Sequence, residues 1–553
     1  MTRRQRRAEA AAPAPPGGPP AWRGLLARLG LILLSAALLV AANPKASIWP
    51  LALFGFVPAL VALRDRSGLA AFGWGWLLGL LCNFGGQYWA VEVLQRFGKL
   101  GFGKALLVLL AVAAYQGLVL GIWAWATRVV TARTRLPLPF VAAAALVVGE
   151  LCIPFLMPWT WALLLTPFWP ATQTAELFGS WSVSFVLMLV NAGLFVALEA
   201  RLERRPAPRR LLLVTAGVVV LALGFGLVRG WHLERVAARS PALRVGLVQP
   251  NFGITTKELR SRRWPEMVDT LRRLSAQAER EGARLVVWPE SGWPLPVDRS
   301  LVADYPDGHP WQLRRGLTVP LLAGVLSLDF TTETQPMHNS AWLLGADGKA
   351  LGRYDKVFLM PFGEYVPLGA EKPEWRRSVR AAMTESDEFN RGARPEMLAV
   401  GAARIAPLIC YEDILAGHVR SYAALRPNLL VTISNVAWFG DTAEPEQQLG
   451  LAALRAVELR HELLRSTNTG VSARIDALGR VRARTRVVDP PRGTMGGEPT
   501  VLTVDARLVD RGRTLYAVVG DLFAYLCAAF LLLGLAVAVL RRPRGLVRDG
   551  LEA

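Results

Sequence analysis

The sequence is poor in cysteine and histidine, with four cysteines and five histidines among its 553 residues. Cys82, Cys152 and Cys527 lie in or beside apolar runs, and only Cys410 falls in a long polar stretch. An intramolecular disulfide is therefore excluded in that stretch. No metal-ligand spacing and no phosphate-binding glycine loop occurs, so we expect no metal and no other cofactor. A lone cysteine in a polar stretch needs an explanation, because an accessible thiol is readily oxidised.

Acidic residues are scarce relative to basic ones, 43 against 63, which gives a formal charge of +20. Such an excess can indicate nucleic-acid binding. Here many arginines stand beside apolar runs, few aromatic residues interleave with them, and no nucleic-acid-binding motif occurs. We therefore expect no nucleic-acid partner.

Apolar residues are abundant, at 52% of the chain, which is too many for an ordinary soluble protein. Residues 1–23, rich in Arg and then in Ala, Pro and Gly, are predicted to form a disordered cytoplasmic tail. A cleaved signal peptide is the alternative, but no small-residue cleavage pattern follows Val40. Eight runs are predicted to span a membrane: 25–42, 48–63, 69–89, 105–130, 138–151, 181–198, 211–228 and 516–540.

The short loops between these runs differ in their content of lysine and arginine. Twenty of these residues would lie on one side of the membrane, and four on the other: Lys45, Arg96, Lys99 and Lys104. Because basic loops stay in the cytoplasm, both termini are predicted to be cytoplasmic. The long stretch between the seventh and eighth spans would then lie outside the cytoplasm.

That stretch alternates short β-rich segments with amphipathic helices, which predicts an α/β domain of about 260 residues. The expected strands are 243–249, 284–288, 319–326, 341–344, 405–409 and 429–433, and the expected helices are 266–281 and 445–464. The predicted division is a tail (1–23), a seven-helix transmembrane domain (24–230), an extramembrane catalytic domain (241–507), a C-terminal transmembrane helix (514–541) and a cytoplasmic tail (542–553).

Three short segments place reactive side chains at predicted strand ends. Trp-Pro-Glu ends at Glu290, Tyr-Asp-Lys ends at Lys356, and the strand 405–409 delivers Cys410. A carboxylate can take the proton of a thiol, the thiolate can attack a carbonyl, and an ammonium can stabilise the resulting oxyanion. Taken singly, each residue has a plainer interpretation: a core cysteine, a helix N-cap, or a solvated charge. Their occurrence together favours catalysis.

The same segments carry a resemblance to a known family. Trp-Pro-Glu, Tyr-Asp-Lys and Ile-Cys-Tyr-Glu resemble the Glu-Lys-Cys triad of the nitrilase superfamily. Together with the stretches 361–367, 435–442 and 464–471 and the apolar runs, the chain resembles the apolipoprotein N-acyltransferases, the membrane-bound members of that superfamily. The resemblance covers nearly everything from Leu25 to Leu540.

The resemblance implies a nitrilase-like αββα sandwich on a membrane domain of about eight helices, in the bacterial cytoplasmic (inner) membrane with the sandwich facing the periplasm. It implies transfer of an acyl chain from a phospholipid, through a thioester, to the N-terminal diacylglyceryl-cysteine of an apolipoprotein. Glu290 would be the base, Lys356 the oxyanion partner and Cys410 the nucleophile. Glu364 would be a supporting carboxylate, and Tyr411 and Glu412 would line the site.

Some positions depart from the family pattern, and none of them falls on the triad. Val436 replaces an Asp, Gln448 replaces a His, Pro250 replaces a Gly, and Glu258 replaces a Trp. They bear on lid loops, lipid contacts and substrate preference. Trp293, Trp438 and Phe439 lie beside the motifs and are candidates for an apolar lipid entrance, with core aromatics as the alternative.

Two other functions use the same features. A membrane-tethered amidase would use the same triad with water as the acceptor. A transporter or scaffold with an inactive extramembrane domain is the third alternative, but few ionisable residues fall inside the apolar runs, and Glu92 and Glu150 lie near their ends. The apolar runs and the Trp-Phe-Gly-Asp stretch favour acyl transfer.

Overall fold

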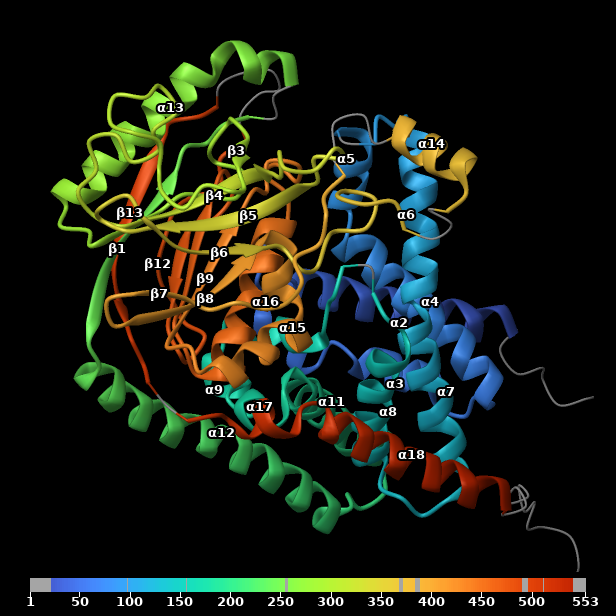
Figure 1. Cartoon of the computed structure of the whole chain (residues 1–553). Helices are drawn as coiled ribbons and strands as arrows, with labels where there is room; N and C mark the ends of the chain where they lie inside the picture. The colour runs from blue at the N-terminus through green and yellow to red at the C-terminus, as the bar shows by residue number, and fades with distance from the viewer. Residues whose placement is uncertain are drawn as a thin grey trace, which may run out of the picture.

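The computed structural model describes residues 21–96, 98–155, 157–253, 257–367, 371–382, 388–489, 496–510 and 512–540. A helical bundle and a two-sheet domain lie against each other (Figure 1). The first 20 residues of the predicted N-terminal tail and the predicted C-terminal tail lie outside the described residues.

Each run predicted to span a membrane contains helix. Six helices among the described residues are long and apolar enough to cross a membrane: Trp22–Ala42, Gly68–Gly86, Phe102–Arg133, Ser180–Leu202, Arg209–Arg239 and Leu522–Leu540. The second and fifth predicted spans correspond to shorter apolar helices, Trp49–Leu63 and Leu138–Cys152. The bundle and its connections comprise α2 (Ala21–Ala42), η1 (Trp49–Leu53), α3 (Val57–Leu63), α4 (Gly68–Gly86), α5 (Trp89–Arg96), α6 (Phe102–Gln116), α7 (Leu118–Arg133), α8 (Leu138–Cys152), η2 (Trp161–Leu165), α9 (Trp169–Thr172), α10 (Ala175–Phe178), α11 (Ser180–Leu202), α12 (Arg209–Arg239), α17 (Leu515–Val519) and α18 (Leu522–Leu540).

The second apolar run is interrupted between η1 and α3, and buried side chains compensate for the break. Asn191 of α11 donates to the carbonyl of Ala52 (2.8 Å) and accepts from the backbone N–H of Phe56 (2.9 Å). Ser35 of α2 donates to the carbonyl of Gly55 (2.6 Å). An unpaired backbone group costs several kcal/mol in an apolar interior, so these two side chains make the interruption tolerable.

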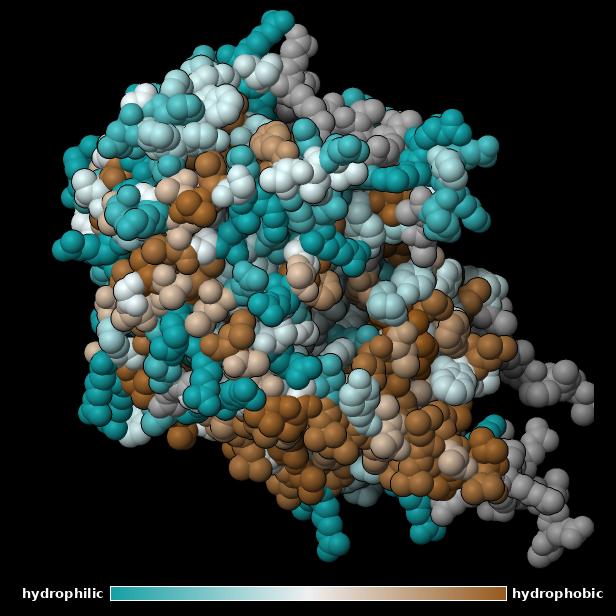
Figure 2. Space-filling model, in the orientation of Figure 1, coloured by the Kyte–Doolittle hydropathy of each residue, from teal (hydrophilic) through white to brown (hydrophobic). Residues whose placement is uncertain are grey.

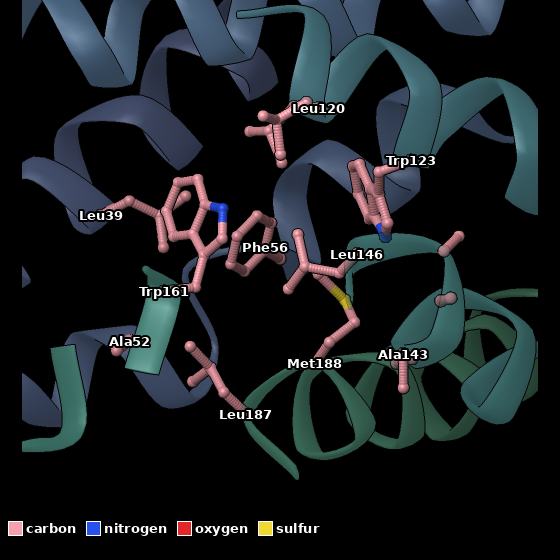
Figure 3. Packing of buried hydrophobic residues seen from close by; sticks show 14 of the residues in the cluster. Leu39, Ala52, Phe56, Leu120, Trp123, Ala143, Leu146, Trp161, Leu187 and Met188 are labelled. Atoms are coloured by element: carbon pink, nitrogen blue, oxygen red, sulfur yellow. The ribbon is translucent and has the colours of Figure 1, made fainter. Parts of the chain in front are cut away.

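The interior of the bundle is packed by aromatic and aliphatic side chains (Figure 3). The ring of Phe56 lies 5.5 Å from that of Trp123 and 4.9 Å from that of Trp161. Helices α4 and α7 approach closely at Gly75, where a Cβ would collide with the backbone of Leu120. Small residues allow such close packing between membrane helices.

The outer face of the bundle is apolar. Figure 2 shows hydrophobic residues gathered over α18 and the neighbouring helices, whereas the surface over the two-sheet domain is largely hydrophilic. Leu532 and Leu533 of α18 and Leu213 and Leu221 of α12 are all more than half exposed. Exposed leucines on this scale are typical of a surface that faces lipid.

The seventh and eighth predicted spans differ in extent from the helices of the structure. Helix α12 continues to Arg239, well beyond the predicted end at Val228, and strand β1 starts at Ala242. The eighth run is divided into α17 and α18 because Gly520, with φ +59°, ends α17. The connection between α12 and β1 is therefore short.

The extramembrane domain contains two sheets. The first has the strand order β13-β1-β2-β4-β5-β6, with β3 paired to β4, and the second has the order β12-β11-β10-β9-β8-β7. The strands are β1 (Ala242–Gln249), β2 (Leu285–Val287), β3 (Val297–Asp298), β4 (Leu321–Leu328), β5 (Met337–Leu344), β6 (Ala350–Asp355), β7 (Leu398–Val400), β8 (Ala403–Ile409), β9 (Leu429–Ser434), β10 (Leu463–Thr467), β11 (Ala473–Ile475), β12 (Val481–Arg484) and β13 (Thr500–Arg507). The helices are α13 (Lys257–Arg280), α14 (Pro373–Ala382), η3 (Cys410–Ile414), α15 (Ala416–Ser421), η4 (Tyr422–Leu425) and α16 (Glu444–Leu459).

These elements form four layers, in the order helix, sheet, sheet, helix (Figure 1). Alternate residues of β1, such as Val245 and Leu247, face the second sheet, whereas Val248 packs with α13. Helices α15 and α16 cover the second sheet. The predicted αββα sandwich is confirmed.

The six predicted strands and two predicted helices are present, but the second helix is shorter than predicted. Helix α16 ends at Leu459 because Arg460 adopts a left-handed conformation, and Leu463 already belongs to β10. Leu463 and Leu464 continue the apolar pattern of the helix. A prediction from periodicity alone therefore extends the helix beyond the turn at Arg460.

Helix α16 lies between the second sheet and the bundle, with 14 of its 16 residues buried. Ala452 and Ala456 pack with the sheet, whereas Leu451, Leu454 and Val457 belong to the core of the bundle. The two parts therefore share one continuous interior at this helix.

Candidate active site

The three predicted catalytic side chains come from three strand ends and meet between the two sheets. Glu290 follows β2, Lys356 follows β6, and Cys410 follows β8. The first two strands belong to the first sheet and β8 belongs to the second. The structure brings all three residues and Glu364 together.

Lys356 is the centre of a buried polar cluster. Its Nζ donates to Glu290 Oε1 (3.2 Å) and to Glu364 Oε1 (2.8 Å), and its side chain is 1% exposed. Burial alone lowers the pKa of Lys356, but the negative charges of Glu290 and Glu364 outweigh it and hold the pKa well above its usual range. The two carboxylates therefore favour the charged ammonium form of Lys356.

Both carboxylates are oriented by further donors. Asn339 Nδ2 donates to Glu290 Oε1 (2.7 Å) and to Glu364 Oε1 (3.2 Å). The backbone N–H of Asn435 donates to Glu290 Oε2 (2.9 Å), and that of Met360 donates to Glu364 Oε2 (2.8 Å). Each carboxylate thus has both oxygens fixed, which limits its motion to small displacements.

Cys410 is the first residue of η3 and has a φ of +53°, in the left-handed region that a β-carbon disfavours. Burial raises the pKa of its thiol well above the ordinary value, Glu290 raises it further, and Lys356 opposes the rise. The resting residue is a neutral thiol, so a nucleophilic role needs a nearby base. Glu290 has the charge and the location for that task.

Glu412 is fully buried. It accepts hydrogen bonds from Tyr354 Oη (2.7 Å) and from the backbone N–H groups of Val357 (2.8 Å), Phe358 (3.0 Å) and Ile409 (2.9 Å). Burial raises its pKa to about 7. The carboxyl group connects the chain beside Lys356 to the chain beside Cys410, which indicates a positioning role instead of the predicted place in the site lining.

The predicted aromatic residues have different surroundings. Trp293 is 1% exposed and stacks on Trp288 in the core under α13, which favours the core-aromatic alternative over an entrance. Phe439 is buried against Trp89 of α5, with ring centroids 5.5 Å apart, and Trp438 packs at the same contact. Tyr411 is partly buried, and burial raises its pKa to about 12.

Several residues of the site were not predicted. Asn339 stands in strand β5 between two other polar residues, His338 and Ser340, so polarity alone does not single it out in the sequence. Gln448 Nε2 donates to the carbonyl of Cys410 (3.3 Å) and to Asp413 Oδ1 (3.1 Å), and Arg465 forms a buried ion pair with Asp413. These contacts from α16 and β10 hold η3 in place.

The departures from the family pattern lie around this support. Gln447, beside Gln448, donates to the carbonyl of Gly86 (2.8 Å) and accepts from Trp89 Nε1 (3.0 Å) in the bundle. Val436 is buried with Phe439. The side chain of Glu258 lies outside the described residues. Within the described part of the chain, no group of three His, Cys, Asp or Glu side chains has the arrangement of a metal site.

Known families match both parts of the chain. Residues 35–193 match the family described as apolipoprotein N-acyltransferase N-terminal domain, and residues 244–490 match the family described as carbon-nitrogen hydrolase. Among solved structures, an amidase of the nitrilase superfamily from Nesterenkonia AN1 is similar, with 20% identity, a TM-score of 0.36, and coverage of 52% of this chain and 98% of the amidase.

Curated relatives cover nearly the whole chain. The apolipoprotein N-acyltransferase of Geobacter metallireducens is 31% identical over 521 residues, which are 90% of this chain and 93% of that protein. That of Azotobacter vinelandii is 32% identical over 480 residues, which are 84% and 87%. By this similarity along both the bundle and the sandwich, the chain belongs to the apolipoprotein N-acyltransferase family.

Proposed function

We propose that this enzyme transfers an acyl chain from a membrane phospholipid, through a thioester on Cys410, to the α-amino group of the N-terminal diacylglyceryl-cysteine of an apolipoprotein. The observation that carries the proposal is the convergence of the partly buried Cys410 thiol, the Lys356 ammonium and two oriented carboxylates. A nucleophile, a base and an oxyanion partner are the groups that acyl transfer needs.

The first half-reaction forms the thioester. Glu290 takes the proton of the Cys410 thiol, the sulfur attacks the ester carbonyl of the phospholipid, and Lys356 stabilises the oxyanion. The C–O bond breaks, and Glu290 returns the proton to the glycerol oxygen of the leaving lysophospholipid. Glu364 holds Lys356 in place and keeps its positive charge.

The second half-reaction consumes the thioester. The neutral α-amine of the acceptor attacks the carbonyl, Glu290 takes a proton from the nitrogen, and the C–S bond breaks as the amide forms. Glu290 then protonates the departing sulfur. Water must be kept out, because hydrolysis of the thioester would waste the acyl chain.

We propose further that the bundle, residues 24–230 with the helix 514–541, lies in the bacterial cytoplasmic membrane and that the sandwich, residues 241–507, faces the periplasm. The excess of basic residues in the loops of one side supports this orientation. A reporter enzyme that is active only outside the cytoplasm should be active when fused near Gly496 and silent near Arg205. The reverse pattern would contradict the orientation.

The nucleophile is tested with a phospholipid labelled in its acyl chain. Purified wild-type protein should acquire a label that neutral hydroxylamine removes, and a diacylglyceryl-peptide should then receive the label as a stable amide. Cys410→Ala should acquire none. Cys152→Ala, a matched loss of an exposed cysteine at the end of α8, should behave as wild type. Label retained by Cys410→Ala would end the proposal.

A further inference from the structure

A short segment after α14 lies directly against the residues that hold the catalytic cluster. The backbone N–H of Phe389 donates to the carbonyl of Glu364 (3.0 Å), and that of Gly392 donates to the carbonyl of Lys356 (2.8 Å). At Gly392 a Cβ would collide with the carbonyl oxygen of Asp355, so only glycine permits this approach. Arg391, between these two anchors, therefore has a fixed backbone beside the site.

The side chain of Arg391 is exposed, and its guanidinium lies over the ring of Tyr365, with Cζ 4.8 Å from the centroid. Stacking uses the face of the guanidinium and leaves the N–H groups at its edge available. No carboxylate among the described residues forms an ion pair with Arg391, whereas Arg394, three positions on, lies 3.8 Å from Glu396. Its contact with Tyr365 therefore holds Arg391 in place, and no carboxylate of the described part of the chain neutralises it.

The surroundings connect this cation to the nucleophile. Tyr365 directly follows Glu364, and it lies close enough to Tyr411, the neighbour of Cys410, to contribute to the raised pKa of Tyr411 after burial. The loop between Lys356 and Glu364 also exposes two phenylalanines, Phe358 by 44% and Phe362 by 39%. A cation held against a loop that exposes apolar rings matches a molecule with an anionic group next to hydrocarbon.

We propose that Arg391 binds the phosphate of the phospholipid acyl donor. The planar guanidinium can donate two parallel hydrogen bonds to the two free oxygens of a phosphodiester. The inference depends on the proposed function, since it assumes a phospholipid as the donor. It assigns Arg391 to the first half-reaction alone, because the diacylglyceryl group of the acceptor carries no phosphate. Arg391 takes no part in the bond changes, and the phosphate leaves with the lysophospholipid.

The test compares Arg391→Ala with Arg394→Ala, a matched loss of an exposed arginine in the same segment. With phospholipid as donor, Arg391→Ala should lower kcat/KM for thioester formation about tenfold, mainly through KM, which is the typical loss of one charge-assisted contact. Transfer from a preformed thioester to a diacylglyceryl-peptide should be unchanged, and Arg394→Ala should match wild type in both steps. Equal rates for the two variants, or a slower second step in Arg391→Ala, would overturn the proposal.

A second donor identifies the origin of the phosphate. A p-nitrophenyl fatty ester, which has no phosphate, should acylate Arg391→Ala and wild type equally in neutral detergent micelles. The same should hold in vesicles of a diether phospholipid that cannot be cleaved. A loss in micelles would mean that Arg391 only shapes the loop, and a loss confined to the vesicles would mean that it binds bulk lipid; both overturn the assignment to the donor.

Failure of the proposed function would look different. Wild-type protein would then form no hydroxylamine-sensitive label from any phospholipid, whatever residue occupies position 391. If the inference alone fails, wild-type protein is still labelled, and Arg391→Ala and Arg394→Ala do not show the predicted difference.

Discussion

Two buried ion clusters in this molecule are opposite in composition. In the proposed active site, one cation, Lys356, lies between two carboxylates, Glu290 and Glu364. At the contact between sandwich and bundle, one carboxylate, Glu176, lies between two cations, with Arg460 Nε at 2.8 Å and Arg229 Nε at 2.7 Å from its oxygens. Both clusters remove charges from water, which is costly unless each charge is paired.

The two clusters differ in how completely their charged groups are paired and hydrogen-bonded. Arg460 also donates to Gln173 Oε1 (2.7 Å) and to the carbonyl of Ala477 (2.9 Å), so the contact cluster is closed by hydrogen bonds. The site cluster has an excess of negative charge and a neutral thiol beside it whose proton must move. A saturated cluster holds two parts together, whereas a cluster with an available base can perform chemistry.

Removing the base should have the largest effect. Glu290→Gln should abolish formation of the hydroxylamine-sensitive label within the time of the assay, because both half-reactions need the carboxylate. The same change removes a negative charge that raises the pKa of Cys410, so the thiol should become more acidic. Iodoacetamide labelling of Cys410 as a function of pH, in a Cys152→Ala background, would measure this. Wild-type rates of thioester formation in Glu290→Gln would refute its role as base.

Changing the cation should come next. Lys356→Arg keeps the charge but replaces a compact ammonium with a planar fork that cannot fit between Glu290 and Glu364 in the same way. We expect thioester formation to slow on the order of 100- to 1,000-fold, the usual effect of losing an oxyanion donor. Single-turnover labelling measures it, and a loss below about threefold would show that charge alone suffices.

Opening the contact cluster should affect stability instead of chemistry. Glu176→Gln leaves Arg460 buried without its carboxylate and should cost about 3–5 kcal/mol in the free energy of unfolding. The control is Glu234→Gln, whose ion pair with Arg480 is half exposed at the carboxylate and should be worth less than about 1 kcal/mol. Thermal unfolding in detergent compares the two. Folded Glu176→Gln should still form thioester at the wild-type rate; a slower rate would mean that the contact also sets the chemistry.

The smallest effect should come from the support behind the nucleophile. Gln448→Leu removes the donor to the carbonyl of Cys410 and should slow thioester formation about three- to tenfold through misplacement of the sulfur. Gln448→His retains a donor and should recover most of the rate, which a purely steric role would not explain. Equal rates of thioester formation in wild type and Gln448→Leu would show that Gln448 does not position the nucleophile.

Much of this arrangement could be predicted from the sequence. Apolar runs give helices because length and composition decide them, and strand-end motifs gave Glu290, Lys356 and Cys410 because side chains at strand ends tend to converge. The break at Ala52 to Phe56 could not be predicted, since it depends on Asn191, far away in the chain. The orientation of Glu412 and the burial of Trp293 also depend on neighbours from other strands, which local patterns do not reveal.

Helix α16 has a consequence for how the protein can be made. Its Leu451, Leu454 and Val457 side chains belong to the apolar core of the bundle, whose helices up to α12 are synthesised before the first strand. During biosynthesis the sandwich therefore meets a docking surface that already exists, and β13 and α18 complete the molecule last. A fragment that begins after Arg239 would expose an apolar helix face to water. We therefore expect such a fragment to self-associate when expressed alone, because the bundle that packs against this face would be missing.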